Sequence, residues 1–476
     1  MKFHFSPACI LLSILIVTLA GCSNNYVDKI DRGAGYQYQP GFPELRLAAT
    51  GQITENNVST VIVNGDIVYG SLVYEQENDT LQARILIEIA VQRKTDEQMV
   101  VEDQISFSET IRAEDQNIIN SQDVFRFEKV FDVPPGSYTI RTVVTDQVSG
   151  KQTSRTQETS IPDPTENVSH ITDIRILTKN TNSSVSDFNQ ATTYDIQSSN
   201  DSLKFTFQVT NNNPNKPLNI ESRLIRFRSD TSIARPMNYN DYSASNIAYI
   251  GIDYDEFEVI QSSTRTLTQP GSVVIEFIFE DLQRGNYRLE VTSKLGEEDE
   301  LYKARDFSIK SPNYPTLQTA KEFARPLYYL MSESEYEKLM AIENAQELKK
   351  AIDRFWLSNV QNSNKAKNVI SLYYERVEEA NKMFSNFKEG WKTDPGMIYI
   401  LFGPPWYNEQ FSGQMLWSYS YNRNDPEKNF LFNQTRLNSK FFPFNNFLLE
   451  RTAQYYNIQS QQVNRWLSGS ILNYNL

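Results

Sequence analysis

The segment EGWKTDPGMIYILFGPP, residues 389–405, decides the fold of the C-terminal part of this chain. Within it, Thr393-Asp394-Pro395-Gly396 predicts a tight turn, because aspartate bonds to the following backbone, proline fixes φ and glycine accepts a positive φ. Residues 397–402 are apolar throughout and predict a buried strand, which Gly403-Pro404 stops. An antiparallel return strand is expected over residues 415–421.

Amphipathic helices are expected upstream of this segment. Apolar residues recur at helical spacing from 336 to 356, after a capping signal at Ser332-Glu333-Ser334-Glu335. Asn362-Ser363-Asn364 breaks the pattern, and a second helix follows with its apolar face formed between 369 and 384. Helices followed by a hairpin predict an α+β domain.

The motif and the helices resemble the GWxTD domain, which is named for five residues seen here as Gly390-Trp391-Lys392-Thr393-Asp394. The resemblance covers residues from about 320 to 435. The other positions that carry it are Gly396, Gly403 and Pro404 beside the motif and Phe355, Trp356, Tyr374, Arg376 and Asn381 on the helices. Pro395 departs from the family, which commonly has arginine there. The resemblance implies a fold and a Bacteroidetes-type cell-envelope setting, with a lipoprotein signal and β domains, rather than a particular reaction.

The region before the helices predicts two tandem all-β, Ig-like sandwiches. Short alternating strands are separated by turn signals, and a pattern of Gly-x-Tyr entering a late strand occurs twice. Tyr138 and Tyr287 occupy equivalent places in this internal repeat, and we expect both to be packing and corner residues. The expected division of the chain is 1–21 signal peptide, 22–45 flexible tether, 46–165 first sandwich, 166–312 second sandwich, 313–435 GWxTD domain and 436–476 aromatic C-terminal segment.

The N-terminus predicts a lipoprotein. A short apolar run ends in Leu19-Ala20-Gly21-Cys22, which resembles a bacterial lipobox, so cleavage before Cys22 and acylation of that cysteine, as by palmitate, are expected. The apolar run is shorter than the about 20 residues needed to span a bilayer. By resemblance to the sorting and export signals of bacterial lipoproteins, Ser23 favours the outer membrane, and the lack of an acidic run after the cysteine favours its periplasmic face over the cell surface.

Composition excludes several classes of function. A net charge of −13 argues against nucleic acid, which requires a basic surface. With Cys22 lipidated and His170 the one histidine beyond the signal peptide, we expect no disulfide, thiolate nucleophile, metal site or cofactor. His170 is expected to be a surface residue. No catalytic residue is assigned.

Asp394 has two interpretations. It could act as a general acid or base beside Trp391, or it could be structural and pair with Arg376 or Arg354. The tail from 436 likewise either docks a partner or folds back with Trp466 in the core. These patterns favour a non-catalytic accessory or scaffold subunit of an outer-membrane assembly, secretion or transport complex. The alternative is an envelope glycan- or peptide-binding protein or hydrolase that uses the GWxTD domain, so enzymatic activity stays open.

Overall fold

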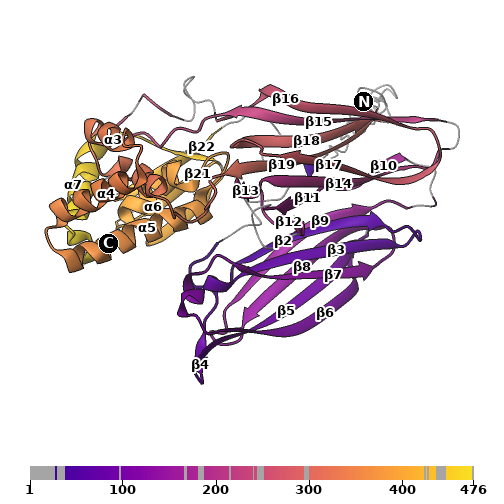
Figure 1. The fold of residues 1–476 in the computed structure, drawn as a ribbon, viewed down its shortest axis with the longest axis horizontal. Coiled ribbons are helices and arrows are strands. Elements are labelled where there is room, and N and C mark those ends of the chain that lie inside the picture. Colours follow the sequence, from indigo (N-terminus) through magenta and orange to yellow (C-terminus); the bar gives the residue numbers. More distant parts are fainter. Residues whose placement is uncertain are drawn as a thin grey trace, which may run out of the picture.

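The computed structural model describes residues 27–28, 38–95, 98–163, 165, 169–180, 187–213, 216–239, 241–243, 251–293, 300–422, 425, 428–435 and 446–473. The predicted signal peptide, Cys22 and most of the tether lie outside the described residues. Two tandem Ig-like β-sandwiches are followed by an α+β domain, which confirms the predicted fold class. In Figure 1 the first sandwich lies below the second, and the helical domain packs at the left end of the second.

The first sandwich packs a three-stranded sheet against a five-stranded one. Alternate residues of β5 point inward, so Ile85, Ile87 and Ile89 are at most 1% exposed while their neighbours face outward. The strands of the first sheet are β2 (Leu45–Ile53), β3 (Ser59–Val68) and β7 (Val124–Asp132), and those of the second are β4 (Glu75–Glu77), β5 (Thr80–Lys94), β6 (Met99–Ala113), β8 (Gly136–Asp146) and β9 (Gln152–Ile161), with η2 (Tyr69–Ser71) and η3 (Gln116–Asn120) between strands.

The second sandwich also packs two sheets face to face, here of five and six described strands, around a core that contains Phe205, Tyr287 and Phe307. One sheet contains β10 (Ser169–Ile171), β11 (Arg175–Lys179), β12 (Asn189–Gln190), β14 (Ser202–Asn211) and β17 (Gly271–Glu280), and the other contains β1 (Val27–Asp28), β13 (Asp195–Gln197), β15 (Leu218–Ser229), β16 (Ile252–Leu267), β18 (Gly285–Ser293) and β19 (Leu301–Lys310).

The internal repeat is visible in the structure. Tyr138 and Tyr287 both enter a late strand, and both side chains are buried. The Tyr138 hydroxyl donates to the carbonyl of Pro134, and the Tyr287 hydroxyl donates to the carbonyl of Gln283 at 2.6 Å. Both tyrosines therefore close a corner four residues upstream, as expected for packing residues.

The C-terminal domain surrounds one buried helix with further helices and a small sheet. Its elements are α2 (Ala320–Ala324), η4 (Arg325–Tyr329), α3 (Glu333–Met340), α4 (Ala345–Val360), α5 (Ser363–Phe384), η5 (Gly390–Lys392), α6 (Asp394–Phe402), β20 (Tyr407–Phe411), β21 (Gln414–Ser418), β22 (Asn429–Gln434), β23 (Phe447–Leu449), α7 (Tyr455–Leu467) and η6 (Ser470–Asn473). The stretch expected to form the first helix is two helices, because Asn344 caps a new one at Ala345.

The strand predicted over residues 397–402 is wrong: these residues form helix α6. Thr393 is its N-cap, with Oγ1 accepting from the amide of Gly396 at 3.1 Å, and Pro395 occupies the first turn, where its missing N–H costs no hydrogen bond. The helix is buried on every side. An apolar run without periodicity fits either a buried strand or a buried helix, so the hydrophobic pattern could not distinguish the two.

The sheet of this domain is formed without that segment. Strand β21 pairs with β20 and β22, and β23 from the tail pairs with β22. Trp466 of α7 is fully buried beside Tyr373, with ring centroids 5.1 Å apart. Residues 447–467 therefore belong to the domain core rather than to a separate segment; Phe441, Phe442, Phe444 and Tyr474 of the predicted tail lie outside the described residues.

Among the described residues, every helix is too short or too polar to cross a bilayer.

Candidate functional site

The GWxTD motif forms a tightly packed corner between α5 and α6. A Cβ atom added to Gly390 would lie 1.9 Å from the carbonyl oxygen of Ala380, and one added to Gly396 would lie 1.9 Å from the carbonyl oxygen of Gly390. Both glycines are thus required by close backbone approach. Trp391 fills the space beside them and is 2% exposed.

Asp394 is held by groups from the C-terminal tail. Its carboxylate accepts two hydrogen bonds from Arg451, Nη1 to Oδ2 at 2.6 Å and Nη2 to Oδ1 at 2.8 Å, and a third from the amide of Leu449 at 2.7 Å. The Arg451 side chain is 0% exposed and the Asp394 side chain is 3% exposed. The expected partners Arg376 and Arg354 are wrong, because Arg451, 57 residues from Asp394 in the sequence, takes their place.

Arg376 instead supports the C-terminal end of α6. Its Nη1 donates to the carbonyl of Ile400 at 3.3 Å, and its guanidinium lies 5.3 Å from the ring centroid of Trp466. Gly403 ends the helix with φ +86°, and a Cβ atom there would lie 2.6 Å from Nη2 of Arg376. A cation at a helix C-terminus interacts favourably with the helix dipole. Pro404 follows on the surface.

The remaining family positions on the helices hold the domain core together. Trp356 packs edge-on against Tyr373, Tyr374 and Phe355. The Tyr374 hydroxyl donates to the carbonyl of Phe323 at 2.9 Å. Asn381 donates to the carbonyl of Pro315 at 2.9 Å and accepts from the amide of Trp391 at 3.2 Å, which joins α5 to the motif and to the interdomain linker.

A charged cluster surrounds Glu389, directly before the motif. Its Oε1 lies 2.5 Å from Arg284 of the second sandwich, and its Oε2 lies 3.1 Å from Lys392 and accepts from the indole of Trp391 at 3.1 Å. Burial raises the pKa of the Glu389 carboxyl, but Lys392 and Arg284 outweigh it and hold that pKa at about 2. Burial lowers the pKa of the Lys392 amine, while Glu389 opposes this effect. Glu389 is therefore ionised and fully engaged.

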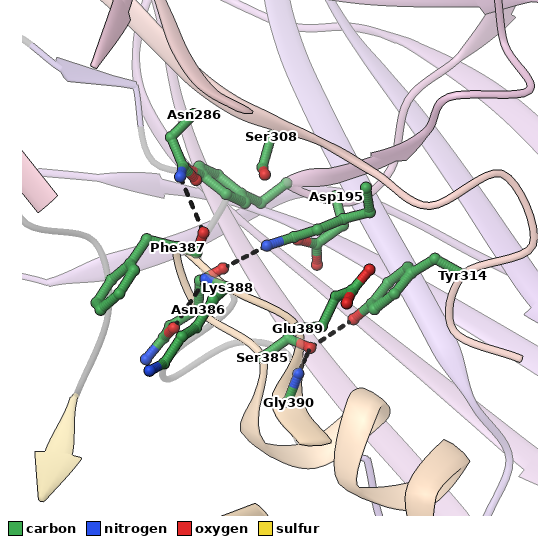
Figure 2. A network of polar contacts seen from close by, with 12 residues as sticks. Asp195, Asn286, Ser308, Tyr314, Ser385, Asn386, Phe387, Lys388, Glu389 and Gly390 are labelled. Atoms are coloured by element: carbon green, nitrogen blue, oxygen red, sulfur yellow. Dashed lines mark hydrogen bonds and ion pairs between the residues drawn. The ribbon is translucent and has the colours of Figure 1, made fainter. Parts of the chain in front are cut away.

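The short segment between α5 and the motif joins the last domain to the second sandwich (Figure 2). Lys310 of β19 donates to the carbonyl of Asn386 at 2.7 Å, and Asn286 of β18 donates to the carbonyl of Phe387 at 2.9 Å. The hydroxyl of Ser385 accepts from Tyr314 at 2.9 Å and from the amide of Gly390 at 2.6 Å. This network fixes the angle between the two domains.

The sequence analysis did not identify four residues that contact the motif or the segment before it, namely Arg451, Ser385, Lys310 and Arg284. Arg451 and Arg284 lie far from the motif in the chain, in segments whose local pattern carries no signal for them. The short segment Asn386-Phe387-Lys388-Glu389, polar except for Phe387, lies between an amphipathic helix and a buried tryptophan and was the available signal for an interdomain contact. Among the described residues, no group of histidine, cysteine and carboxylate side chains could hold a metal ion.

The expectation that His170 is a surface residue is wrong. It lies half-buried in β10, where its Nε2 is buried without a hydrogen-bond partner among the described residues. Burial and the nearby Lys303 lower the pKa of its imidazole to about 4, and Asp173 opposes them. The imidazole is neutral at pH 7.

The fold and the hydrogen-bond network between the last two domains define a multidomain β-sandwich protein with a C-terminal α+β domain. Residues 294–468 match the family model of the GWxTD domain, so the chain carries that domain, and the resemblance read from the motif is confirmed. The match begins within the second sandwich, ahead of the boundary predicted at 313, and therefore includes β19. A search of curated proteins gives no match to the chain.

Solved structures give only distant similarity. Red sea bream transglutaminase is 9% identical, with 58% of this chain and 32% of that chain covered and a TM-score of 0.19. A Salmonella alpha-2-macroglobulin mutant is 13% identical, with 58% of this chain and 17% of that chain covered and a TM-score of 0.19. An Escherichia coli alpha-2-macroglobulin activated by porcine elastase is 10% identical, with 74% of this chain and 36% of that chain covered and a TM-score of 0.18. This chain spans about a third or less of the length of these proteins. TM-scores this low do not assign the chain to the class of any of them.

Proposed function

We propose that this protein is a non-catalytic accessory or scaffold subunit of an envelope assembly, secretion or transport complex. It is anchored through the lipid on Cys22 to the periplasmic face of the outer membrane. The observation that carries the proposal is that the motif is used for joining domains. Asp394 and Glu389 are both buried and fully paired within the chain. A carboxylate held in this way is unsuited to proton transfer, because substrate cannot reach it.

Contacts between all three domains support a rigid rather than a jointed molecule. Gln208 of the second sandwich makes a pair of hydrogen bonds with the backbone of Ile53 in the first, at 2.8 and 3.0 Å. Lys382 of α5 lies 3.3 Å from the buried carboxylate of Glu44 in the first sandwich. Interdomain polar contacts of this kind hold modules in a fixed relation, as a scaffold requires.

The alternative function, in which Trp391 and Asp394 bind or cleave glycan or peptide, is not favoured by their surroundings. Stacking on a sugar requires an accessible ring, but Trp391 is 2% exposed and its indole is bonded to Glu389. The Asp394 carboxylate is closed off by Arg451 and Leu449.

Partner binding has a better candidate at one edge of the small sheet that the described residues form. Strand β20 lies at the end of the order β20-β21-β22-β23, and it carries the exposed rings of Tyr407 and Phe411 on one face, 52% and 54% exposed. Trp406 and Tyr421 pack against each other nearby, with ring centroids 4.8 Å apart and ring planes tilted by 52°. Aromatic residues are enriched in interfaces, and an edge strand can pair with an extended segment of a partner.

Affinity purification tests this function. Tagged full-length protein would be isolated from outer membranes in mild detergent, and its partners would be identified by mass spectrometry. We expect one stoichiometric partner that is lost with Phe411→Lys and kept with Val130→Lys, a control whose residue is 56% exposed on the first sandwich. Cys22→Ser should move the protein to the soluble fraction. A protein that emerges alone, or two lysine variants that behave alike, would contradict the proposal.

A further inference from the structure

A cavity of about 310 Å³ lies between the second sandwich and the GWxTD domain. The turn before β18, the end of β19 and the start of η4 form part of its wall, and the segment 387–392 closes it. A volume of this size is at the small end of ligand pockets, which begin at about 300 Å³. The cavity therefore suits one compact chemical group.

Cationic side chains dominate the lining of this cavity. They are Arg284, Lys310, Arg325, Lys388 and Lys392, and the one carboxylate among the lining residues is Glu389. Two further carboxylates balance lysines from outside the lining: Asp195 lies 3.5 Å from Lys310, and Asp230 lies 3.7 Å from Lys388. Five cations thus face three carboxylates in a chain whose overall net charge is −13.

The carboxylate of the cavity is already paired with two of these cations. One oxygen of Glu389 is taken by Arg284, and the other by Lys392 and the Trp391 indole. Arg325 is half-buried, and among the described residues its guanidinium has no hydrogen-bond or ion-pair partner. A guanidinium has five donors in a planar fork that matches phosphate oxygens.

Repulsion between the cations is also evident. Burial lowers the pKa of the Lys392 amine, and Arg284 and Arg325 lower it further, although Glu389 opposes them. Burial likewise lowers the pKa of the Lys388 amine. Lys392 lowers this pKa further, and Asp230 raises it. An anion in the cavity would relieve this repulsion and favour the charged form of both lysines.

We propose that this interdomain cavity binds the phosphate group of a phosphate monoester, with Arg325 as its main ligand and Lys392 and Arg284 as further ligands. An excess of two cations over carboxylates matches a dianion better than a single carboxylate. Because the walls belong to two domains, the bound phosphate would also strengthen their joint. The site is separate from the aromatic edge of β20.

Calorimetric titration of the full-length protein in detergent with inorganic phosphate, at constant ionic strength, tests the site. Arg325→Gln removes a group without an intramolecular partner and should therefore fold normally. We expect it to raise the Kd for phosphate by about tenfold or more, because charge-assisted hydrogen bonds are the strong ones. Arg112→Gln, which removes an exposed arginine of β6 in the first sandwich, is the matched control and should leave the Kd unchanged.

The source of the phosphate can be distinguished in the same experiment. Glycerol 3-phosphate represents a free monoester, and phosphatidic acid added to the detergent micelles, with phosphatidylcholine as its control, represents a lipid headgroup. Binding of either that requires Arg325 supports the site and identifies its source. Absence of phosphate binding to the wild type at millimolar concentration would overturn the proposal. So would equal affinities of the Arg325→Gln and Arg112→Gln proteins.

Discussion

Asp394 and Arg451 form a bidentate ion pair in the interior of the last domain, with nitrogen–oxygen distances of 2.6 and 2.8 Å. The same guanidinium donates to the carbonyls of Arg235 and Pro236 at 3.0 and 3.1 Å, in a loop that leaves the second sandwich. One side chain thus connects the first turn of α6, the tail and the preceding domain. The aspartate of the motif anchors that connection.

Replacing Asp394 with asparagine should destabilise the protein strongly. The variant leaves the Arg451 charge buried without a counterion, and removing one partner of a buried pair costs about 3–5 kcal/mol. Urea unfolding followed by tryptophan fluorescence measures the free energy of unfolding. The double variant Asp394→Leu, Arg451→Met should recover much of that loss, because no unpaired charge remains. A stable Asp394→Asn protein would refute the structural role.

Adding a methyl group at Gly390 should be more damaging than adding one at Gly413. At Gly390 a Cβ meets rigid backbone of α5 at 1.9 Å, so the corner must open, whereas nothing lies within 4 Å of a Cβ at Gly413. We expect Gly413→Ala to cost about 1 kcal/mol, from its positive φ alone, and Gly390→Ala to cost more than about 3 kcal/mol. Thermal unfolding of both variants checks the order; equal losses would argue against the close approach.

Thr393→Ala should remove the N-cap of α6. The Oγ1 atom accepts from the amide of Gly396 and donates to the carbonyl of Gly390 at 2.7 Å, so both bonds disappear. Loss of such a cap costs about 0.5–2 kcal/mol. Thr393→Ser keeps the hydroxyl and should remain within about 0.5 kcal/mol of the wild type. Denaturant titration distinguishes the two, and an equally unstable serine variant would assign the effect to the methyl group instead.

Stability should fall as the pH drops below 6.5, because of His170. The folded-state pKa of about 4 lies below the ordinary value of 6.5, so the unfolded chain binds the proton more readily. The contribution is fully present above pH 6.5 and is lost as the pH falls toward 4. Allowing for partial exposure, we expect about 1–2 kcal/mol between pH 6.5 and 4.5.

His170→Gln provides the comparison for that pH dependence. Glutamine does not titrate, so its unfolding free energy should change less over the window from pH 6.5 to 4.5, which lies above most of the range in which carboxylates protonate. Unfolding curves at four or five pH values would show the difference. Parallel profiles for the wild type and the variant would contradict a buried neutral imidazole.

Local chemistry was enough to predict many features of this chain. Alternating strands, the repeated Gly-x-Tyr and the capping signal at Ser332 predicted the sandwiches, both tyrosine corners and the start of α3, because each depends on residues close in sequence. The apolar face of α5 was likewise readable from helical spacing, and the residues of the motif themselves carried the resemblance to the GWxTD domain.

The sequence by itself determined the order of domains and the residues available for the core, but the turn predicted at Thr393-Asp394-Pro395-Gly396 is the start of helix α6. Tertiary structure decided that residues 397–402 are helical, that Arg451 is the partner of Asp394, and that Arg284, Arg325 and Lys392 line one cavity. An apolar run has no periodicity to distinguish helix from strand, and a buried charge takes the nearest partner in space. Which residues meet across domains depends on the fold as a whole, and no local pattern carries that information.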